Sequence, residues 1–315
     1  MRDAFFETLE QLMGRDERIV FITADLGFRL FDHIAARYPE RVINAGIREA
    51  TMIGMAAGLS KEGMLPFVYS LVPFVTMRCL EQIRVDLCYN DLPAVLVGVG
   101  SGLAYGPNGP THMGLEDIGV MSALPNLAIL SPCDACEVRA LLPQAIRLKT
   151  PVYVRLARAG EPSCYGEHAP KPRLGRPSVL REGADAAVIT YGTMVHEVLA
   201  AVGELEKETG CSIRVISWHT VQPLREESIL PLAKDTIPMM VVEEQMSGGS
   251  LGSRLALFLK ERAIHSPFCH LHLPGEYPNV CGDREYLLAR GKLSKRHIKR
   301  KLKAFLHAAQ AATGA

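Results

Sequence analysis

The sequence predicts an α/β protein with two doubly wound, mainly parallel sheets. Three observations lead to this expectation. Short apolar runs alternate with longer helical patterns, an order that produces parallel strands with crossover helices. Hydrophobic residues make up 48% of the 315 residues and aromatic residues only 6%, as expected for strands buried on both faces. A stretch rich in Pro and Gly separates a longer first alternation from a shorter second one, and the chain length suits two domains.

The first alternation is expected to form a domain over residues 1–160. Each of its strands is predicted where a short apolar run is bounded by turn residues, at 18–27, 41–44, 65–70, 93–99, 126–130 and 151–156. Its helices are predicted at 3–13, 31–38, 74–89 and 134–148, with a further helix that begins near Glu49. The first strand ends in Asp25 and Gly27, as strands do when they lead into a functional loop.

Residues 161–184 are expected to be a linker, because prolines, glycines and mixed charges replace any apolar period. The second domain is expected at 185–315. Its strands are predicted at 186–190, 212–217, 239–243 and 268–271, and its helices at 195–209, 228–232, 253–264 and 292–307. The last helix is basic, and we interpret it as a solvated face because the whole chain is nearly neutral.

Charge and composition exclude several classes of function. The chain has 35 basic and 34 acidic residues, so we expect neither a nucleic acid nor a membrane surface as its partner. No apolar run reaches the roughly 18 residues of a spanning helix, and the N-terminus has no secretory pattern. These features predict a soluble, cytoplasmic protein.

The eight cysteines lie scattered in apolar segments, and we expect free, buried thiols in a reducing compartment. Only Cys133 and Cys136 have the spacing of a redox or metal pair. No second pair and no histidine cluster lies near them in sequence, so we interpret them as the start of a helix after a strand. No metal-ligating residues are expected in this chain.

Glu49 is the most unusual residue of the first domain, because it places a carboxylate at the head of an otherwise apolar helix. A carboxylate in such surroundings loses hydration and must be paired with a cation or carry a proton, which makes it a candidate acid or base. An acidic residue in a first helical turn can also simply offset the helix dipole and bond free amides. Gly54 and Gly58 in the same helix indicate close packing against a neighbour.

A second candidate is His112, which lies in a loop at 106–118 whose Gly and Pro residues fix a rigid path. Such a loop would hold the imidazole out from the end of a sheet, where open α/β folds bind ligands. The preceding run from Gly98 to Gly102 resembles half of a dinucleotide fingerprint, but no helix can follow it directly, so a nicotinamide cofactor is not expected. Phosphate loops and nucleophile elbows are missing.

Several short motifs then occur in a fixed order: Asn44-x-Gly46-Ile47-x-Glu49, Pro66-Phe67, Phe74, Glu81-Gln82-Ile83-Arg84, Gly109-Pro110-Thr111-His112, Glu116-Asp117, Pro125-Asn126, Pro132-x-Asp134, Arg155-x-x-Arg158, Val242-Glu243-Glu244 and Gly248-Gly249-x-x-Gly252. In this order and spacing they resemble the pyrimidine-binding and C-terminal domains of transketolases. The resemblance covers residues 15–305. It implies thiamine diphosphate as cofactor and transfer of a two-carbon ketol unit from a ketose (phosphate) donor to an aldose acceptor.

The diphosphate-binding half of a transketolase is missing from this sequence. That half carries a Gly-Asp-Gly motif, followed by an Asn, that holds Mg²⁺ and the cofactor's diphosphate; here Gly282-Asp283 is followed by Arg284. The chain therefore resembles the C-terminal subunit of a split transketolase. The resemblance implies that an N-terminal partner subunit holds the divalent ion, that the assembly is an α₂β₂ heterotetramer, and that this chain alone is inactive.

The resemblance also assigns cofactor contacts. Glu49 would donate a proton to a ring nitrogen of the aminopyrimidine and so help to activate the thiazolium carbon. Phe74 would stack on the aminopyrimidine, with Leu71 nearby and Phe67 as the alternative ring. Asp25 is expected to contact the cofactor as well.

Substrate contacts are expected from His112, Asn108, Arg158 and Arg29. His112 would bond the donor's oxygen and assist proton movement, and Arg158 would bind a substrate phosphate, although both it and Arg155 could instead pair with acids. The chain departs from the family at Asn108, where Asp is common, at Gly100, where an additional His is found, and at Arg29, where a small hydroxyl residue is expected. These departures suggest a modified, acidic or specialised sugar rather than the usual pentose phosphates.

Three alternatives stay open at this point. The β subunit of a 2-oxo acid dehydrogenase has the same two-domain plan and would release carbon dioxide from a 2-oxo acid. A carboligase similar to deoxyxylulose-phosphate synthase shares the Gly-Pro-Thr-His motif and would use pyruvate with an aldehyde. A degenerate scaffold subunit would bind a partner without chemistry, but it would need none of Glu49, Phe74 and His112.

Overall fold

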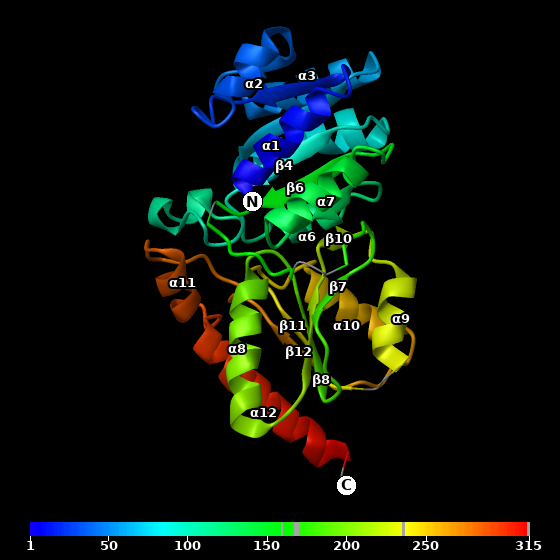
Figure 1. Ribbon diagram of the computed structural model, residues 1–315, viewed down its shortest axis with the longest axis vertical. Helices are drawn as coiled ribbons and strands as arrows, with labels where there is room; N and C mark the ends of the chain where they lie inside the picture. The colour runs from blue at the N-terminus through cyan, green and yellow to red at the C-terminus, as the bar shows by residue number, and fades with distance from the viewer. Residues whose placement is uncertain (159, 167–169, 235–236, 314–315) are drawn as a thin grey trace.

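The computed structural model describes residues 1–158, 160–166, 170–234 and 237–313, and it places two α/β domains one above the other (Figure 1). The upper domain holds a seven-stranded sheet in the order β10-β5-β6-β4-β3-β1-β2, and the lower a five-stranded sheet in the order β12-β11-β8-β9-β7. All strand pairs are parallel except β10 with β5 and β7 with β9. The predicted fold of two mainly parallel sheets is confirmed.

The strands of the first domain are short, apolar and mostly buried. They are β1 (Ile19–Thr23), β2 (Val42–Asn44), β3 (Leu65–Leu71), β4 (Val95–Val99), β5 (Ala128–Leu130) and β6 (Val152–Leu156). Its helices are α1 (Arg2–Met13), α2 (Asp32–Arg37), α3 (Glu49–Lys61), α4 (Val72–Val75), α5 (Leu80–Gln82), α6 (Asp117–Ser122) and α7 (Ala135–Ala145). Short turns of other helix types are η1 (Pro39–Arg41), η2 (Met77–Cys79), η3 (Ile83–Tyr89), η4 (Gly106–Asn108) and η5 (Pro110–His112).

Helices cover both faces of the first sheet, which explains why its strands read as continuous apolar runs. On one face, Phe5 of α1 and Leu141 of α7 belong to the same buried cluster as the strands. On the other, Ile53 of α3 and Ile118 of α6 join a second cluster. The alternation predicted from sequence therefore follows from burial on two sides.

The order of the strands identifies the place, at the carboxyl ends of β1 and its neighbours, where a ligand can bind. β1 pairs with β2 on one side and with β3 on the other, both in parallel, so the chain reverses its direction of winding at β1. In open parallel sheets the crevice for ligands lies beyond the carboxyl ends of the strands at such a reversal. The loop that follows β1 carries the predicted residue Asp25, and the short helix α4 that follows β3 carries Phe74.

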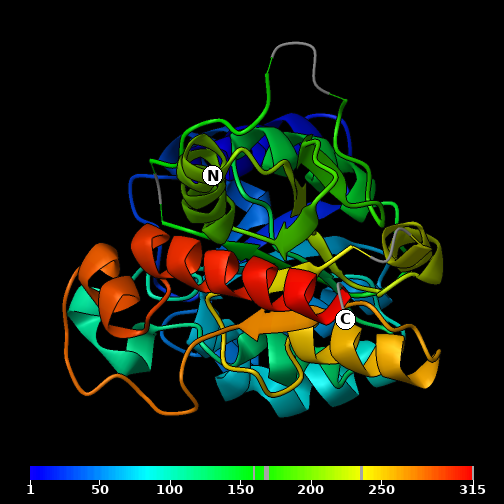
Figure 2. The same cartoon turned by 90° about the horizontal axis from the view of Figure 1, so that it is seen from below.

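The second domain packs helices on both faces of its sheet. Its strands are β7 (Ser178–Arg181), β8 (Ala186–Thr190), β9 (Ile213–Ser217), β11 (Met239–Val242) and β12 (Phe268–Leu271). Its helices are α8 (Met194–Thr209), α9 (Glu226–Lys234), α10 (Leu251–Glu261), α11 (Arg284–Arg290) and α12 (Lys295–Thr313). Seen from below, α12 runs across the domain, and it packs against α8 (Figure 2).

The basic helix α12 is partly neutralised by its neighbour. Lys299 lies 3.0 Å from Glu204 and 2.7 Å from Glu208 of α8, and Lys295 lies 2.7 Å from Glu204. The face predicted to be solvated is therefore in part an ion-paired contact between two helices.

One strand and one buried apolar cluster connect the two domains. β10 (Thr220–Gln222), which follows β9, leaves the second domain and pairs antiparallel with β5 at the edge of the first sheet. Trp218, which precedes it, is 2% exposed and belongs to the buried cluster that also contains Met121 of α6. The second domain is thus anchored on the first by apolar burial as well as by backbone pairing.

Several predicted elements were incomplete. The expected helix 74–89 is broken into α4, η2, α5 and a π-helical η3. The expected linker contains β7, and β10, α6 and α11 were missed. The cysteines of the described chain are all free, but only Cys79, Cys88 and Cys133 are fully buried. No helix within the described ranges is long and apolar enough to cross a bilayer.

Candidate active site

The loops after β1 and β2 are locked together by Asn44. Its side-chain oxygen accepts hydrogen bonds from the backbone N–H of Asp25 at 3.0 Å and of Gly46 at 2.9 Å, and its amide donates to the Asp25 carboxylate at 3.2 Å. Asp25 has φ 57° and Gly46 φ 69°, so both turns use the left-handed region that favours Gly and Asn or Asp. This lock fixes the path of the chain into α3, and hence the position of Glu49.

Glu49 opens α3 and is 3% exposed. Its Oε2 accepts a hydrogen bond from Nη1 of Arg78 at 2.7 Å. Of the two outcomes that the sequence allowed for a carboxylate here, the isolated chain shows pairing with a cation. Arg78 is not among the predicted site residues.

Arg78 links Glu49 to the two other central candidates. Its guanidinium lies 4.0 Å from the centre of the Phe74 ring, a cation–π contact. The edge of Phe74 in turn meets the imidazole of His112, with ring centres 5.2 Å apart and planes at 67°. The structure therefore brings Glu49, Phe74 and His112 into one continuous group, although they come from three separate segments.

The break in the predicted helix 74–89 makes this group possible. Thr76 leaves helical geometry, with φ −104° and ψ −85°, and its hydroxyl donates to the carbonyl of Val72 at 2.6 Å. The chain then restarts at η2, which carries Arg78 toward Glu49. The four-residue spacing of Phe74 and Arg78 is a sequence signal for contact between these two side chains. The contact of Arg78 with Glu49 could not be predicted without the break at Thr76.

Phe74 and the alternative ring differ in accessibility. Phe67 lies inside β3, is fully buried and faces Phe5 with ring centres 6.4 Å apart. Leu71 ends β3 and is 6% exposed, whereas Phe74 is half-buried at the edge of the sheet. Of these three side chains, Phe74 is the one that presents an aromatic surface on which a ligand could stack.

The loop that carries His112 is stiff, as its composition predicted. Gly102 and Gly114 exchange two backbone hydrogen bonds, both 3.0 Å, and so close its base. Between them the chain makes η4 and η5, joined by Gly109 with φ 80°. Nδ1 of His112 lies 2.9 Å from the hydroxyl of Thr111, which orients the ring. Asn108 is exposed on the same loop.

Arg155, near the end of β6, and Arg158, just beyond it, have different environments. Arg155 is 3% exposed, and it donates from Nε to Asp117 at 2.8 Å, from Nη2 to the carbonyl of Gly114 at 2.8 Å and to Gln245 at 3.1 Å. Burial alone would lower the pKa of Arg155, but the Asp117 carboxylate raises it above its ordinary value. Arg155 is therefore a structural cation beneath the His112 loop.

Arg158 is exposed, and its guanidinium lies 5.5 Å from the centre of the Tyr105 ring. It borders a cavity of about 330 Å³ that is also lined by Thr193, His196 and Arg284. Arg284 is already paired with Glu244 and Glu197, so Arg158 is the arginine of this cavity that suits an anionic group. Of the two predicted arginines, Arg158 is the one whose side chain is exposed and could reach a ligand.

Tyr105 explains the glycine at position 100. Gly100 has φ 89°, and a Cβ added there would overlap the Tyr105 ring. The space next to Gly100 is thus filled by a tyrosine from further along the loop. Arg29, the third departure, is exposed after β1, and its backbone N–H donates to Asp32 at 3.1 Å.

A glutamate of the second domain binds the loop that follows β4 in the first domain. Glu244 is 3% exposed, accepts from the backbone N–H of Leu103 at 2.7 Å, and pairs with Nη2 of Arg284 at 2.5 Å. It therefore ties the loop after β4 to α11. Arg284 was missed because the short helix α11 has no clear apolar period in the sequence.

The adjacent Glu243 is fully buried and binds the start of α10. It accepts from the backbone N–H of Leu251 at 3.2 Å and of Gly252 at 2.9 Å, and from the hydroxyl of Tyr191 at 2.7 Å. Burial alone would raise the pKa of Glu243, but hydrogen bonds led by that from His270, 2.5 Å away, lower it below its ordinary value.

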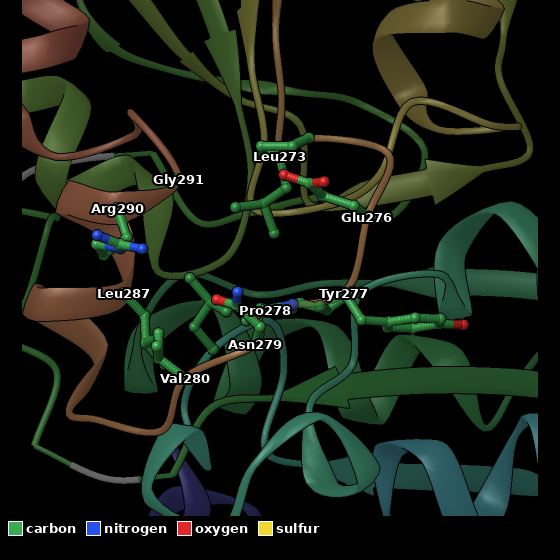
Figure 3. Close-up of a pocket in the computed structure, with 12 residues that line it drawn as sticks. Leu273, Glu276, Tyr277, Pro278, Asn279, Val280, Leu287, Arg290 and Gly291 are labelled. Atoms are coloured by element: carbon green, nitrogen blue, oxygen red, sulfur yellow. The ribbon is translucent and has the colours of Figure 1, made fainter.

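A separate pocket of about 310 Å³ lies between α11 and the segment 273–280 (Figure 3). Its lining includes Leu287, Val280 and Arg290, and none of the predicted site residues. Tyr277 at its rim donates from its hydroxyl to Glu116 at 2.6 Å, next to the His112 loop. Asp283, which belongs to the Gly-Asp pair of the sequence, caps α11 by accepting from the N–H of Tyr286 at 2.8 Å.

Comparison with known proteins identifies both domains. Residues 1–160 match the transketolase pyrimidine-binding domain, and residues 175–298 match the transketolase C-terminal domain. The 6-deoxy-6-sulfo-D-fructose transketolase subunit of Clostridium sp. (strain MSTE9) is 35% identical over 83% of this chain and 81% of its own length. An apulose-4-phosphate transketolase subunit of Phocaeicola vulgatus is 33% identical over 94% of each chain.

Other matches extend this similarity. The 1-deoxy-D-xylulose-5-phosphate synthase of Shouchella clausii is 34% identical over 86% of this chain, which spans 43% of that enzyme. A solved structure described as a split gene transketolase, inactive beta4 tetramer, superimposes with a TM-score of 0.84 and 31% identity, covering 98% of this chain and 97% of that one. A transketolase from Leishmania mexicana shares the fold, with a TM-score of 0.80 at 20% identity over 98% of this chain and 45% of its own.

Proposed function

The chain belongs to the transketolase family, as a C-terminal subunit of a split transketolase, and from that premise we propose that it works with a diphosphate-binding partner to transfer a two-carbon ketol unit. The donor would be a ketose and the acceptor an aldose. The observation that carries the proposal is the group of Glu49, Phe74 and His112 at the carboxyl edge of the first sheet. A carboxylate, an aromatic face and an imidazole are the contacts that an aminopyrimidine and a sugar require.

These residues fit one half of a thiamine diphosphate site. Phe74 offers a half-buried ring, and Glu49 a carboxylate that is shielded from water. When bound, thiamine diphosphate supplies the nucleophilic carbon and the electron sink that ketol transfer needs. The magnesium ion and the diphosphate would be held by the partner.

Glu49 would hold a proton at the pyrimidine ring nitrogen, which requires that Arg78 release Oε2. Arg78 is 45% exposed, so its guanidinium can turn outward without disturbing the core. In this arrangement the Glu49–Arg78 pair stabilises the buried carboxylate until the cofactor takes the place of the arginine. His112, oriented by Thr111, would bond the donor's carbonyl oxygen and move a proton there, an effect of about 10²- to 10⁴-fold in rate.

The substrate is proposed to carry an anionic end. Exposed Arg158 lines a cavity, and the named substrates of two relatives are a sulfo-sugar and a sugar phosphate. Asn108, which can donate as well as accept a hydrogen bond, and Tyr105 in place of the additional histidine would adjust the choice of sugar. Arg29 and Asp25 would complete the substrate and cofactor contacts of the loop after β1.

The working assembly is proposed to be a cytoplasmic α₂β₂ heterotetramer. The exposed side of α3 supports this, because a Cβ added at Gly54 or Gly58 meets no atom from the rest of this chain within 4 Å. Among the described residues of this subunit, no element packs closely against these two glycines, although their spacing predicted such a contact. A second subunit could approach closely there.

The decisive experiment compares three preparations: this chain, the diphosphate-binding subunit, and the two co-expressed. We expect ketol transfer only from the complex, and only with Mg²⁺ and thiamine diphosphate. Strong magnesium-dependent activity from this chain alone would overturn the split-enzyme assignment. Use of pyruvate with an aldehyde would instead favour the carboligase alternative, and carbon dioxide release from a 2-oxo acid the dehydrogenase alternative.

A substitution then tests the role of Glu49. Glu49→Gln should lower kcat of the complex by at least about 10²-fold while assembly remains intact. The control is Glu62→Gln, an exposed residue at the other end of α3, which should behave as wild type. A near-normal rate in Glu49→Gln would remove Glu49 from the mechanism.

A further inference from the structure

Four potential metal ligands from three separate segments meet beside β5, away from the Glu49 group. We call Cys133, Asp134, Cys164 and His196 the thiol cluster. The two Sγ atoms and a carboxylate oxygen of Asp134 all lie within 4.8 Å of one another. His196, in the first turn of α8, places Nδ1 3.3 Å from Sγ of Cys164.

The hydrogen bonding of His196 fixes which ring nitrogen can bind a ligand. Nε2 lies 3.1 Å from the carbonyl oxygen of Cys133. A carbonyl can only accept, so Nε2 carries the hydrogen and Nδ1 turns its lone pair toward Cys164. Histidines that bind metals are oriented in this way, with the second ring nitrogen donating to a carbonyl or carboxylate.

The spacing also suits a tetrahedral ion. Zinc binds thiolate sulfur at about 2.3 Å and imidazole nitrogen at about 2.0–2.1 Å, so tetrahedral ligands lie roughly 3.5–3.8 Å apart. Sγ of Cys164 lies 3.3 Å from Nδ1 of His196, and the ligand atoms of Cys133, Asp134 and Cys164 lie within 4.8 Å of one another, so both sets of distances are close to tetrahedral spacing.

Two buried carboxylates, Asp134 and Glu137, lie beside the cluster at the N-terminus of α7. Asp134 accepts from the backbone N–H of Glu137 at 2.9 Å and of Cys164 at 2.8 Å, while Glu137 accepts from the N–H of Cys133 at 2.7 Å and the hydroxyl of Tyr165 at 2.6 Å. Within the described ranges, neither carboxylate has a Lys or Arg in an ion pair. The helix N-terminus and the hydrogen bonds offset part of their negative charge, and a cation bound beside them would offset more.

The donor atoms of the cluster suit a soft ion. Sγ of Cys133 and Sγ of Cys164 lie within 4.8 Å of each other and of an Asp134 carboxylate oxygen. Two thiolates, an imidazole and a carboxylate form a ligand set that favours Zn²⁺ over Mg²⁺.

We propose that the thiol cluster binds one zinc ion, through Cys133, Cys164, Nδ1 of His196 and Asp134. All four positions are filled by protein, as in structural rather than catalytic zinc sites. The ion would join the loop after β5, the segment that connects the domains, and α8 of the second domain. It is separate from the magnesium proposed for the partner subunit.

The proposal is tested on the full chain, alone and in complex with its partner, purified under reducing conditions. We expect about one zinc per chain by elemental analysis, and thiolate-to-metal charge-transfer absorption after replacement by Co²⁺. Cys164→Ser and His196→Gln should lose the ion and the absorption band. The control Cys136→Ser, which changes the half-exposed neighbour on α7, should retain both.

Stability provides a second measurement that does not depend on the variants. Added Zn²⁺ at about 100- to 1,000-fold its Kd should raise the Tm of the metal-free wild-type chain by roughly 4–6 °C. Failure of the wild type to bind Zn²⁺ or Co²⁺ under reducing conditions would overturn the proposal. So would unchanged zinc content in Cys164→Ser, or a Cys133–Cys164 disulfide formed by peroxide at the same rate with and without Zn²⁺.

Discussion

Neighbouring residues of the same type can serve quite different purposes, and Arg155 and Arg158 are the clearest case. Both fit the family pattern, and both lie at or just beyond the end of β6. Arg155 turns inward to Asp117, and Arg158 outward to the cavity beside Tyr105. Side-chain alternation at the end of a strand separates them, and burial then determines what each guanidinium can bind.

These two arginines make a matched pair for mutation. Arg155→Met would leave Asp117 buried without its cation, so we expect the free energy of unfolding to fall by about 3–5 kcal/mol. Arg158→Met should leave stability within about 0.5 kcal/mol but raise KM for an anionic sugar by roughly 10- to 100-fold, through loss of a charge-assisted hydrogen bond. Urea unfolding and steady-state kinetics of the complex measure the two effects. The reverse pattern would contradict the assignment.

At the scale of elements, the second domain positions the loops of the first. Glu244 reaches the loop after β4, and Glu243 joins β11 to the start of α10 and to His270 on β12. Gly252 has no side chain because the His270 ring occupies that space. The motif Val242-Glu243-Glu244 is thus explained by hydrogen bonds that hold elements together rather than by contact with a ligand.

The lowered pKa of Glu243 predicts a pH-dependent effect on stability. A carboxylate whose pKa is lower in the folded chain stabilises the fold above its ordinary value of 4.5, and this contribution is lost as the pH falls through the folded value. Glu243→Gln should therefore cost about 1–3 kcal/mol at pH 7, with a smaller difference from wild type below about pH 4. Exposed Glu285→Gln is the control. An equal deficit at both pH values would show that packing, not charge, is responsible.

At the scale of the molecule, this chain has an apolar core of its own and an incomplete site. Its buried clusters cover both faces of both sheets, while the Glu49 group lies at a sheet edge. The helix that carries Glu49 also presents Gly54 and Gly58 outward. Because α3 carries both Glu49 and the open face with Gly54 and Gly58, we expect assembly with a partner and cofactor binding to depend on each other.

A bulky residue on this face should block assembly without unfolding the chain. Gly58→Trp adds a side chain where no atom from the rest of this subunit lies within 4 Å, so we expect unchanged thermal unfolding of the isolated chain. Copurification with the partner should fall by at least roughly 10-fold, since even about 1.4 kcal/mol of steric cost has that effect. Leu257→Trp at an exposed position of α10 is the control. Normal assembly of Gly58→Trp would place the contact elsewhere.

The sequence by itself determined the two-domain α/β plan, the positions of most strands, and the candidates Glu49 and His112, while Phe74 followed from the family resemblance. It could do so because strands buried on both faces leave a local apolar signature, and because a charge among apolar residues or a stiff Gly-Pro loop is visible without a fold. β7 alternates partly buried and exposed residues, and β10 has polar Thr220 and Gln222 on either side of Val221, so neither gives a continuous apolar run. Both are edge strands that form only because a neighbouring strand is already there.

Tertiary structure alone decided the partners of these residues. Arg78 reaches Glu49 because a helix breaks at Thr76, Arg155 and Arg158 diverge because one side chain is buried, and Cys133 meets Cys164 and His196 rather than its sequence neighbour Cys136. Each of these contacts joins segments far apart in the chain or depends on the direction of a side chain. Such pairings are set by packing, which local sequence patterns do not encode.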